Sequence, residues 1–135
     1  MRRTSVACVL SAAGVCSGQT WTSVGPAPIA SGPYTGRVAA IVTSPSDPNK
    51  YLIGGADGGV WRTSDGGSTW TPVTDSMPTT AIGAMAMDPT NELVVYAGTG
   101  EANFANHSRH GVGIYKSTDG GITWTHLARQ TFAGR

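Results

Sequence analysis

The chain has 135 residues, of which 13% are charged and 19 are glycine, and its formal net charge is +1. Few charges and many glycines favour short strands joined by tight turns over a solvated helical domain. The near-neutral charge, without a basic stripe or an aromatic stacking platform, leads us to expect no nucleic-acid partner.

Residues 1–18 resemble a secretory signal peptide. Arg2 and Arg3 precede a weakly apolar run over residues 6–15, and small residues follow at 16–18. An irregular N-terminus is the alternative interpretation. The run is too short to cross a bilayer, so we expect no membrane span. A signal peptide predicts that the protein is secreted, periplasmic or held in the cell envelope.

Both cysteines, Cys8 and Cys16, lie in this leader. After its removal no cysteine would remain for a disulfide or a metal site. The same cleavage would remove two arginines and leave 7 basic against 8 acidic side chains. We expect no cofactor and no bound metal.

An eight-residue pattern occurs twice. Residues 63–70 read TSDGGSTW, and residues 117–124 read STDGGITW, a separation of 54 residues. A long pattern repeated at a fixed distance indicates a repeat architecture. The Asp-Gly-Gly core predicts a turn, because the carboxylate can accept backbone N–H groups and glycine adopts positive φ without a Cβ clash. The following Thr-Trp is expected to begin a strand.

Three short segments with strand character precede each turn, and one follows it. In the first unit they are residues 38–42, 51–54, 60–62 and 69–73, and in the second 82–86, 96–98, 114–116 and 123–127. A further segment at 20–24 matches the fourth strand but has no unit of its own in front of it. Four short strands per unit are typical of a β-propeller blade.

We therefore expect an all-β chain: a β-propeller fragment of about two four-stranded blades, a spare N-terminal outer strand and the start of a third blade. The expected boundaries are 1–18 for the leader, 19–36 for the outer strand and lead-in, 37–77 for blade 1, 78–130 for blade 2 and 131–135 for the truncated third blade. Because propellers have about 4–8 blades, the expected partners include missing C-terminal blades of the same protein.

The repeated turn resembles the Asp box of BNR-repeat propellers, whose consensus is Ser/Thr-x-Asp-x-Gly-x-Thr-Trp. The resemblance, which extends to secreted glycosyl-hydrolase-like, sortilin-type and photosystem-assembly propellers, implies a turn between the third and fourth strands of each blade. We expect Asp65 and Asp119 to bind their own backbone rather than to act in catalysis. The structural positions assigned on this basis are Ser64, Asp65, Gly67, Trp70, Ser117, Asp119, Gly121 and Trp124.

The second unit contains an insertion. The two units are offset by 44 residues up to Gly98 and by 54 from Gly113, so ten residues are added within 101–110. In propellers the connection between second and third strands opens opposite the Asp boxes, where ligands usually bind. The expected ligand-binding residues are Glu101, Asn103, Phe104, His107, Arg109 and His110. No third ligand accompanies the two histidines, so we expect no metal there.

Glu101 and Asp57 are the candidate catalytic carboxylates. Glu101 could bind sugar hydroxyls, act as an acid or base, or only anchor its own loop. The stretch around Asp57 resembles xyloglucan-cleaving propeller endoglucanases, in which a catalytic Asp precedes Val-Gly-Gly-Ala-Tyr-Arg. Aligned on Arg62, that catalytic position falls on Ala56, one residue before Asp57.

Two functions remain open. The first is a secreted or envelope scaffold propeller that binds polysaccharide or an extracellular protein on the end opposite the Asp boxes. The alternative is a glycoside hydrolase, a xyloglucanase-like endoglucanase that uses pocket carboxylates and is incomplete in this fragment. Glycoside hydrolysis needs two carboxylates at a set separation. The Arg-Ile-Pro signature of sialidases is absent from the sequence.

Overall fold

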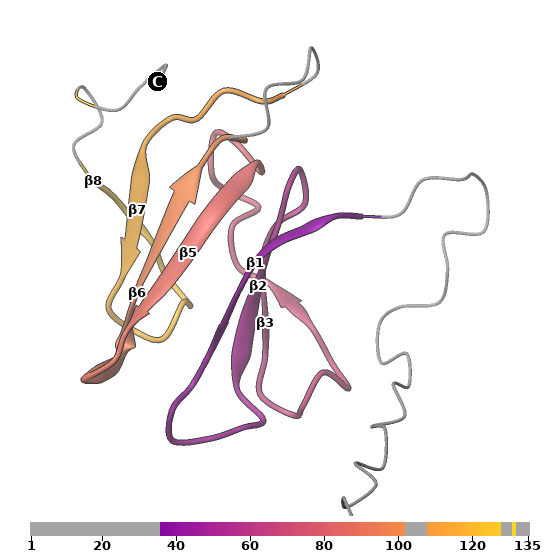
Figure 1. Ribbon diagram of the computed structural model, residues 1–135, viewed down its shortest axis with the longest axis vertical. Coiled ribbons are helices and arrows are strands. Elements are labelled where there is room, and N and C mark those ends of the chain that lie inside the picture. The colour runs from indigo at the N-terminus through magenta and orange to yellow at the C-terminus, as the bar shows by residue number, and fades with distance from the viewer. Residues whose placement is uncertain (1–35, 102–107, 128–130, 132–135) are drawn as a thin grey trace, which may run out of the picture.

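The structure, a computed structural model, describes residues 36–101, 108–127 and 131. It contains two antiparallel four-stranded sheets (Figure 1). The first comprises β1 (Val38–Thr43), β2 (Tyr51–Gly55), β3 (Gly59–Thr63) and β4 (Thr71–Pro72). The second comprises β5 (Ile82–Asp88), β6 (Asn91–Thr99), β7 (Ile114–Ser117) and β8 (Thr125–Leu127).

These sheets confirm the predicted all-β class with two four-stranded units. The predicted leader, the strand at 20–24 and all but one residue of 131–135 lie outside the described residues. In the described part of the chain, no helix is long and apolar enough to cross a membrane.

The two sheets repeat each other in register. Each is a simple meander in which every strand pairs with its neighbour in the chain. Ile41, Ile53 and Trp61 lie opposite one another across the first sheet, and Met85, Ala97 and Tyr115 form the corresponding row of the second. The first strand of each sheet, β1 and β5, also carries a register shift near its start. The repeat seen in the sequence is therefore also a repeat of structure.

The fourth strands begin later than predicted. We expected each Thr-Trp to start a strand, but β4 starts at Thr71 and β8 at Thr125, directly after the tryptophans. The indoles instead complete the turns. The ring of Trp70 packs edge-on against Tyr51 with centroids 5.4 Å apart, and Trp124 Nε1 donates to the Gly121 carbonyl at 3.2 Å.

The apolar core lies between the two sheets. The buried residues that form it are Val42, Leu52 and Val60 from the first sheet and Ile82, Val95 and Ala97 from the second. Gly54 allows the close approach: a Cβ there would lie 2.6 Å from Ile82 Cγ2 and 2.9 Å from Met85 Sδ. Burial of this apolar surface is the main force that holds the sheets together.

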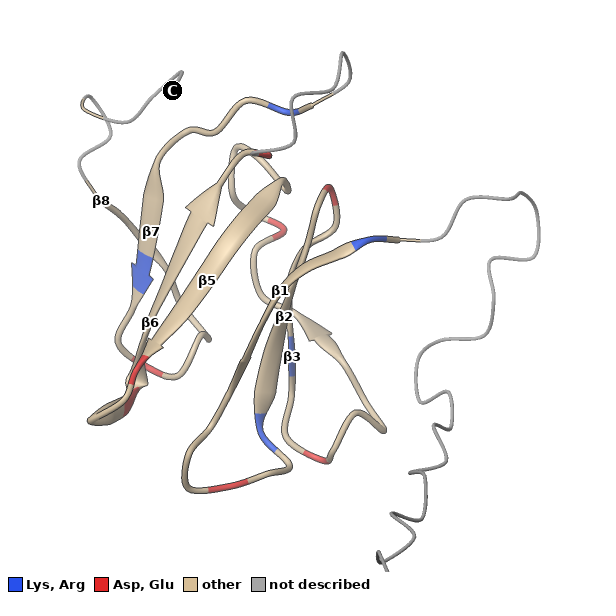
Figure 2. Ribbon diagram, in the orientation of Figure 1, with Lys and Arg blue, Asp and Glu red and all other residues tan. Residues whose placement is uncertain are grey.

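The meanders give the pair of sheets two distinct ends. We call the end with residues 36–37, 56–58, 100–101 and 108–113 the loop end. The opposite end, with residues 44–50, 64–70, 89–90 and 118–124, is the turn end. Figure 2 shows that most charged residues lie at these two ends, whereas the strand interiors carry few charges.

The close approach at Gly54 predicts a stability difference between two glycine substitutions. Gly54→Ala should lower the free energy of unfolding by about 1–3 kcal/mol, because the added methyl overpacks the interface. Chemical denaturation followed by tryptophan fluorescence would measure the change. The control is Gly58→Ala, where a Cβ would lie 3.8 Å from Gly55 Cα and should shift stability by less than about 0.5 kcal/mol. Equal effects would contradict the packing described.

Candidate functional site

The first Asp turn is held by its carboxylate. Asp65 accepts bonds from the Thr69 backbone N at 2.9 Å and the Thr69 hydroxyl at 2.6 Å. The Thr63 hydroxyl donates to the same carboxylate at 2.8 Å. The second turn repeats these contacts through Ser117, Asp119 and Thr123.

Hydrogen bonding lowers the pKa of both aspartates. The Thr69 hydroxyl, then its backbone N–H and the Thr63 hydroxyl, hold the pKa of Asp65 at about 2. The hydroxyl and backbone of Thr123, with the Ser117 hydroxyl, hold the pKa of Asp119 at about 2. Carboxylates that are charged and hydrogen-bonded within their own turns are suited to stabilising the turn rather than to proton transfer.

Thr63, and not Ser64, supplies the hydroxyl of the first turn. Thr63 is buried at the end of β3 and accepts from Gly67 N at 3.0 Å, while Ser64 is exposed. Ser117 accepts from Gly121 N at 2.8 Å in the same way. Thr63 lies 54 residues before Ser117, so the repeat distance itself identifies the correct residue. Both turn glycines, Gly67 and Gly121, adopt positive φ.

At the loop end an ion pair joins the two sheets. Arg37 Nη2 lies 2.9 Å from Glu101 Oε1, and the side chains are 52% and 9% exposed respectively. Arg37 precedes β1, and its carbonyl accepts from Ala56 N at 2.9 Å. Glu101 follows β6, and its side chain is largely buried where it reaches Arg37 beside the first sheet.

A second ion pair crosses the same end. Arg109 Nη2 lies 3.3 Å from Asp57 Oδ2, with side chains 65% and 53% exposed. The Thr80 hydroxyl also donates to Asp57 at 3.3 Å. Asp57 lies in the turn between β2 and β3, whereas Ala56, at the position of the endoglucanase aspartate, is buried. The two candidate carboxylates therefore share one end of the sheets, and each has an arginine partner.

The base of the insertion is closed by Thr99. Its hydroxyl accepts from Val112 N at 2.8 Å and Gly113 N at 3.0 Å, and donates to the Gly113 carbonyl at 2.7 Å. Glu101 N donates to the Arg109 carbonyl at 3.0 Å, which places these two charged residues side by side. Of the other predicted ligand-binding residues, His110 is exposed, and Asn103, Phe104 and His107 lie outside the described residues.

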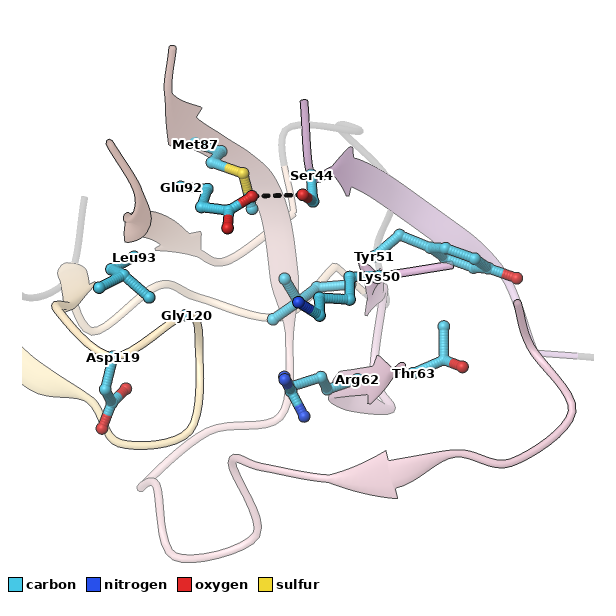
Figure 3. A pocket seen from close by; sticks show the side chains of 11 residues that line it. Ser44, Lys50, Tyr51, Arg62, Thr63, Met87, Glu92, Leu93, Asp119 and Gly120 are labelled. Carbon is cyan, nitrogen blue, oxygen red and sulfur yellow. Dashed lines mark hydrogen bonds between the residues drawn. The ribbon is translucent and has the colours of Figure 1, made fainter. Parts of the chain in front are cut away.

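A small cavity lies at the turn end, between the sheets (Figure 3). Its volume is about 90 Å³, and its lining includes Lys50, Arg62 and Asp119. Glu92 also lines it and accepts hydrogen bonds across the sheets from the Ser44 and Ser46 hydroxyls, which lower its pKa. Neither Glu101 nor Asp57, the candidate catalytic carboxylates, lines this cavity.

Two residues that the sequence did not single out lie in the loop end or contact it. Arg37 is one. Only the preceding Gly36 marks it in the sequence, and its partner Glu101 is 64 residues away. His126 is the other. Its ring stacks on Tyr115 with centroids 4.4 Å apart, and its Nε2 lies 2.7 Å from the Val112 carbonyl. Within residues 36–101 and 108–127, no group of three or more His, Cys, Asp or Glu side chains could hold a metal ion.

Two curated proteins are similar to this chain in sequence. A xyloglucanase from Hypocrea jecorina (strain QM6a) is 32% identical over 113 residues, which is 72% of this chain and 12% of that protein. A xyloglucanase from a Paenibacillus species is 35% identical over 107 residues, 67% of this chain and 10% of that protein. The chain thus spans about a tenth of the length of these relatives. No protein-family model matches it.

Solved structures show the same arrangement of sheets. A GH74 xyloglucanase from Xanthomonas campestris has a TM-score of 0.50 and 20% identity, over 65% of this chain and 14% of that one. An ancestral GH74 enzyme has a TM-score of 0.53 and 22% identity, over 66% of this chain and 12% of that one. The two four-stranded sheets match propeller blades of these structures, so the fold is that of a β-propeller.

The turn carboxylates predict how stability depends on pH. Their pKa falls from the ordinary value of 3.8 to about 2 on folding. Their contribution is therefore complete above about pH 4 and is lost as the pH falls toward 2. Asp65→Asn and Asp119→Asn should lower stability at pH 7 and flatten its decline between about pH 4 and 2. Urea denaturation across this range would measure both effects, with Asp75→Asn, an exposed carboxylate outside the turns, as control. A decline as steep as that of the unchanged chain would contradict this role.

The loop-end pairs predict unequal losses of stability. Arg37→Met should lower the free energy of unfolding by about 1–3 kcal/mol, because it leaves the largely buried Glu101 carboxylate without its charged donor. Arg109→Met breaks a solvated pair and should cost less than about 1 kcal/mol. Urea denaturation at pH 7 compares the free energies of unfolding of the two variants. A larger loss for Arg109→Met would mean that burial does not set the strength of these pairs.

Proposed function

We propose that the chain is part of a polysaccharide-binding β-propeller and that its loop end contacts a glucan of the xyloglucan type. The observation that carries the proposal is the clustering of two arginine–carboxylate pairs, from both sheets, at one end of a fold whose similar proteins are named xyloglucanases. A polymeric ligand is met outside the cell, in keeping with the secretory leader expected at residues 1–18.

The chemistry of the loop end suits sugar hydroxyls. Each hydroxyl can donate one hydrogen bond and accept others, so planar groups with several donors or acceptors bind it well. The exposed Asp57–Arg109 pair offers both kinds of group to a ligand. The more buried Arg37–Glu101 pair supports the backbone beside it, because Glu101 N is bonded to the Arg109 carbonyl. The Asp57–Arg109 pair therefore faces the ligand, and the Arg37–Glu101 pair fixes the position of the Asp57–Arg109 pair.

Glycoside hydrolysis is the second candidate function, and the names of the similar proteins favour it. The reaction requires one carboxylic acid to protonate the leaving oxygen and a second carboxylate as base or nucleophile. Asp57 and Glu101 each accept hydrogen bonds from an arginine already. That arrangement fits hydrogen bonding to hydroxyls better than proton donation, so binding is the function we place first.

Binding should depend on the loop end. Isothermal titration calorimetry with soluble xyloglucan should show affinity reduced about tenfold or more by Asp57→Asn, since it removes a charged hydrogen-bonding group worth roughly 1.5–3 kcal/mol. Glu101→Gln should reduce affinity by less, because it only weakens the support of the backbone beside Arg109. Asp47→Asn, at the turn end, should bind like the unchanged chain. Circular dichroism checks that each variant is folded.

The same mixtures should be assayed for new reducing ends. Binding without hydrolysis is the expected result. Hydrolysis that Glu101→Gln or Asp57→Asn abolishes would overturn it in favour of the enzyme. Absence of binding, or binding that none of the loop-end substitutions changes, would contradict both functions.

A further inference from the structure

The cavity at the turn end is formed where the two sheets pack on each other. Lys50 and Arg62 line it on the side of the first sheet, and Glu92 and Asp119 on the side of the second (Figure 3). All of its lining residues lie in the described part of the chain. Where the described strands adjoin undescribed segments, they do so at the loop end, the opposite end of the sheets. The walls of the cavity are therefore set by the packing of these two sheets.

Arg62 reaches into this cavity from the middle of the first sheet. It lies in β3 directly opposite Leu52 of β2, and residues directly opposite each other in a strand pair point to the same face. Leu52 is 3% exposed in the core, so Arg62 also points toward the second sheet, where it is half-buried. The ion pairs found in the described part of the chain use Arg37, Lys50 and Arg109, but not Arg62. The guanidinium donors of Arg62 are therefore available to a ligand.

The two carboxylates that line the cavity are already hydrogen-bonded to other groups. Glu92 accepts from the hydroxyls of Ser44 and Ser46, and Asp119 accepts from the hydroxyls and backbone of its own turn. These bonds lower the pKa of both carboxyl groups, so both are charged at neutral pH. Two negative charges repel a doubly charged anion more strongly than a singly charged one. A ligand of Arg62 is therefore expected to carry a single negative charge.

Lys50 adds a second positive charge to the cavity. Its ammonium lies 3.4 Å from Asp47 Oδ2, and the two side chains are 46% and 32% exposed. A solvated pair of this kind contributes little stability, so the ammonium can turn to a ligand at small cost. The lining also contains the apolar side chains of Leu52, Met87 and Leu93. The cavity therefore combines two cations with a short apolar wall.

The size of the cavity limits its ligand. The volume is about 90 Å³, and a cavity needs about 10–15 Å³ to hold one water, so there is room for about six to nine water-sized groups. A carboxylate of three or four carbons has about five or six non-hydrogen atoms and fits this space. A hexuronic acid, with about thirteen non-hydrogen atoms, is too large by the same comparison.

We propose that the turn-end cavity binds a small aliphatic monocarboxylate of three or four carbons. The planar guanidinium of Arg62 would donate to both carboxylate oxygens, the bidentate geometry that arginine favours with carboxylates. Lys50 would supply the second positive charge, and the short chain would lie against the apolar side chains of the wall. The ligand would contact both sheets at once, so its binding would also stabilise their packing.

Titration of the isotope-labelled chain with sodium propionate, followed by backbone amide chemical shifts, measures this binding. At constant ionic strength the amides around the cavity should shift and saturate in the millimolar range, as expected for so small a ligand. Arg62→Met keeps the side-chain stem beside Leu52 but removes the guanidinium, and should weaken binding about tenfold or more. Arg62→Lys keeps the charge without the planar fork and should also weaken it. Arg109→Met, which removes an exposed arginine at the loop end, is the matched control and should bind propionate like the unchanged chain.

A second variant tests the cavity without changing Arg62. Leu93 is 52% exposed and lines the cavity, so Leu93→Trp should fill the space, abolish propionate binding and leave the circular dichroism spectrum unchanged.

Two other anions test the charge and the size of the ligand. Phosphate and glucuronate should each bind at least about tenfold more weakly than propionate, because one carries a second charge at neutral pH and the other exceeds the space. Equal affinity for phosphate would overturn the assignment to a monocarboxylate, and equal affinity for glucuronate would overturn the limit on size. Absence of saturable shifts with propionate, or shifts that both Arg62→Met and Leu93→Trp leave unchanged, would overturn the site itself.

Discussion

The close approach of the two sheets at Gly54 is the constraint on which the other features depend. Gly54 has no side chain to separate it from Ile82. The segment that connects the two sheets can therefore form backbone hydrogen bonds with both sheets. The Thr80 carbonyl accepts from Gly59 N at 2.7 Å, and the Ala81 carbonyl accepts from Gly100 N at 2.9 Å. These bonds hold the loop ends of the two sheets together, and the ion pairs that cross between them follow from that spacing.

The sequence predicted the local features well. The hydrogen bonds of an Asp-Gly-Gly-x-Thr turn come from residues within four positions of the aspartate, so the pattern at residues 63–70 was sufficient to predict the turn. The insertion was equally visible, because two offsets measured along one repeat must differ by its length. In the structure β6 ends at Thr99 and β7 begins at Ile114. The hydroxyl of the first turn was misassigned, to Ser64 in place of Thr63, and both fourth strands begin two residues later than predicted.

The contacts between the sheets could not be predicted in the same way. Arg37 and Glu101 are 64 residues apart, and neither lies in a sequence motif from which its partner could be predicted. The cavity at the turn end depends on where Lys50 and Arg62 of one sheet fall relative to Glu92 and Asp119 of the other. Such placements follow from the spacing and twist of packed sheets, which a single sequence does not express as a pattern.

The meander topology has a consequence for how the chain reaches its native state. Every strand pairs with the strand before or after it, so each sheet can form through contacts between residues close in sequence. Loops that close over short stretches lose little entropy, and folding is fast when such contacts dominate. The contacts over Gly54 and between Arg37 and Glu101 join residues more distant in sequence. We expect them to form only once both sheets exist. We therefore expect the sheets to be the units of folding and their docking to be the later step.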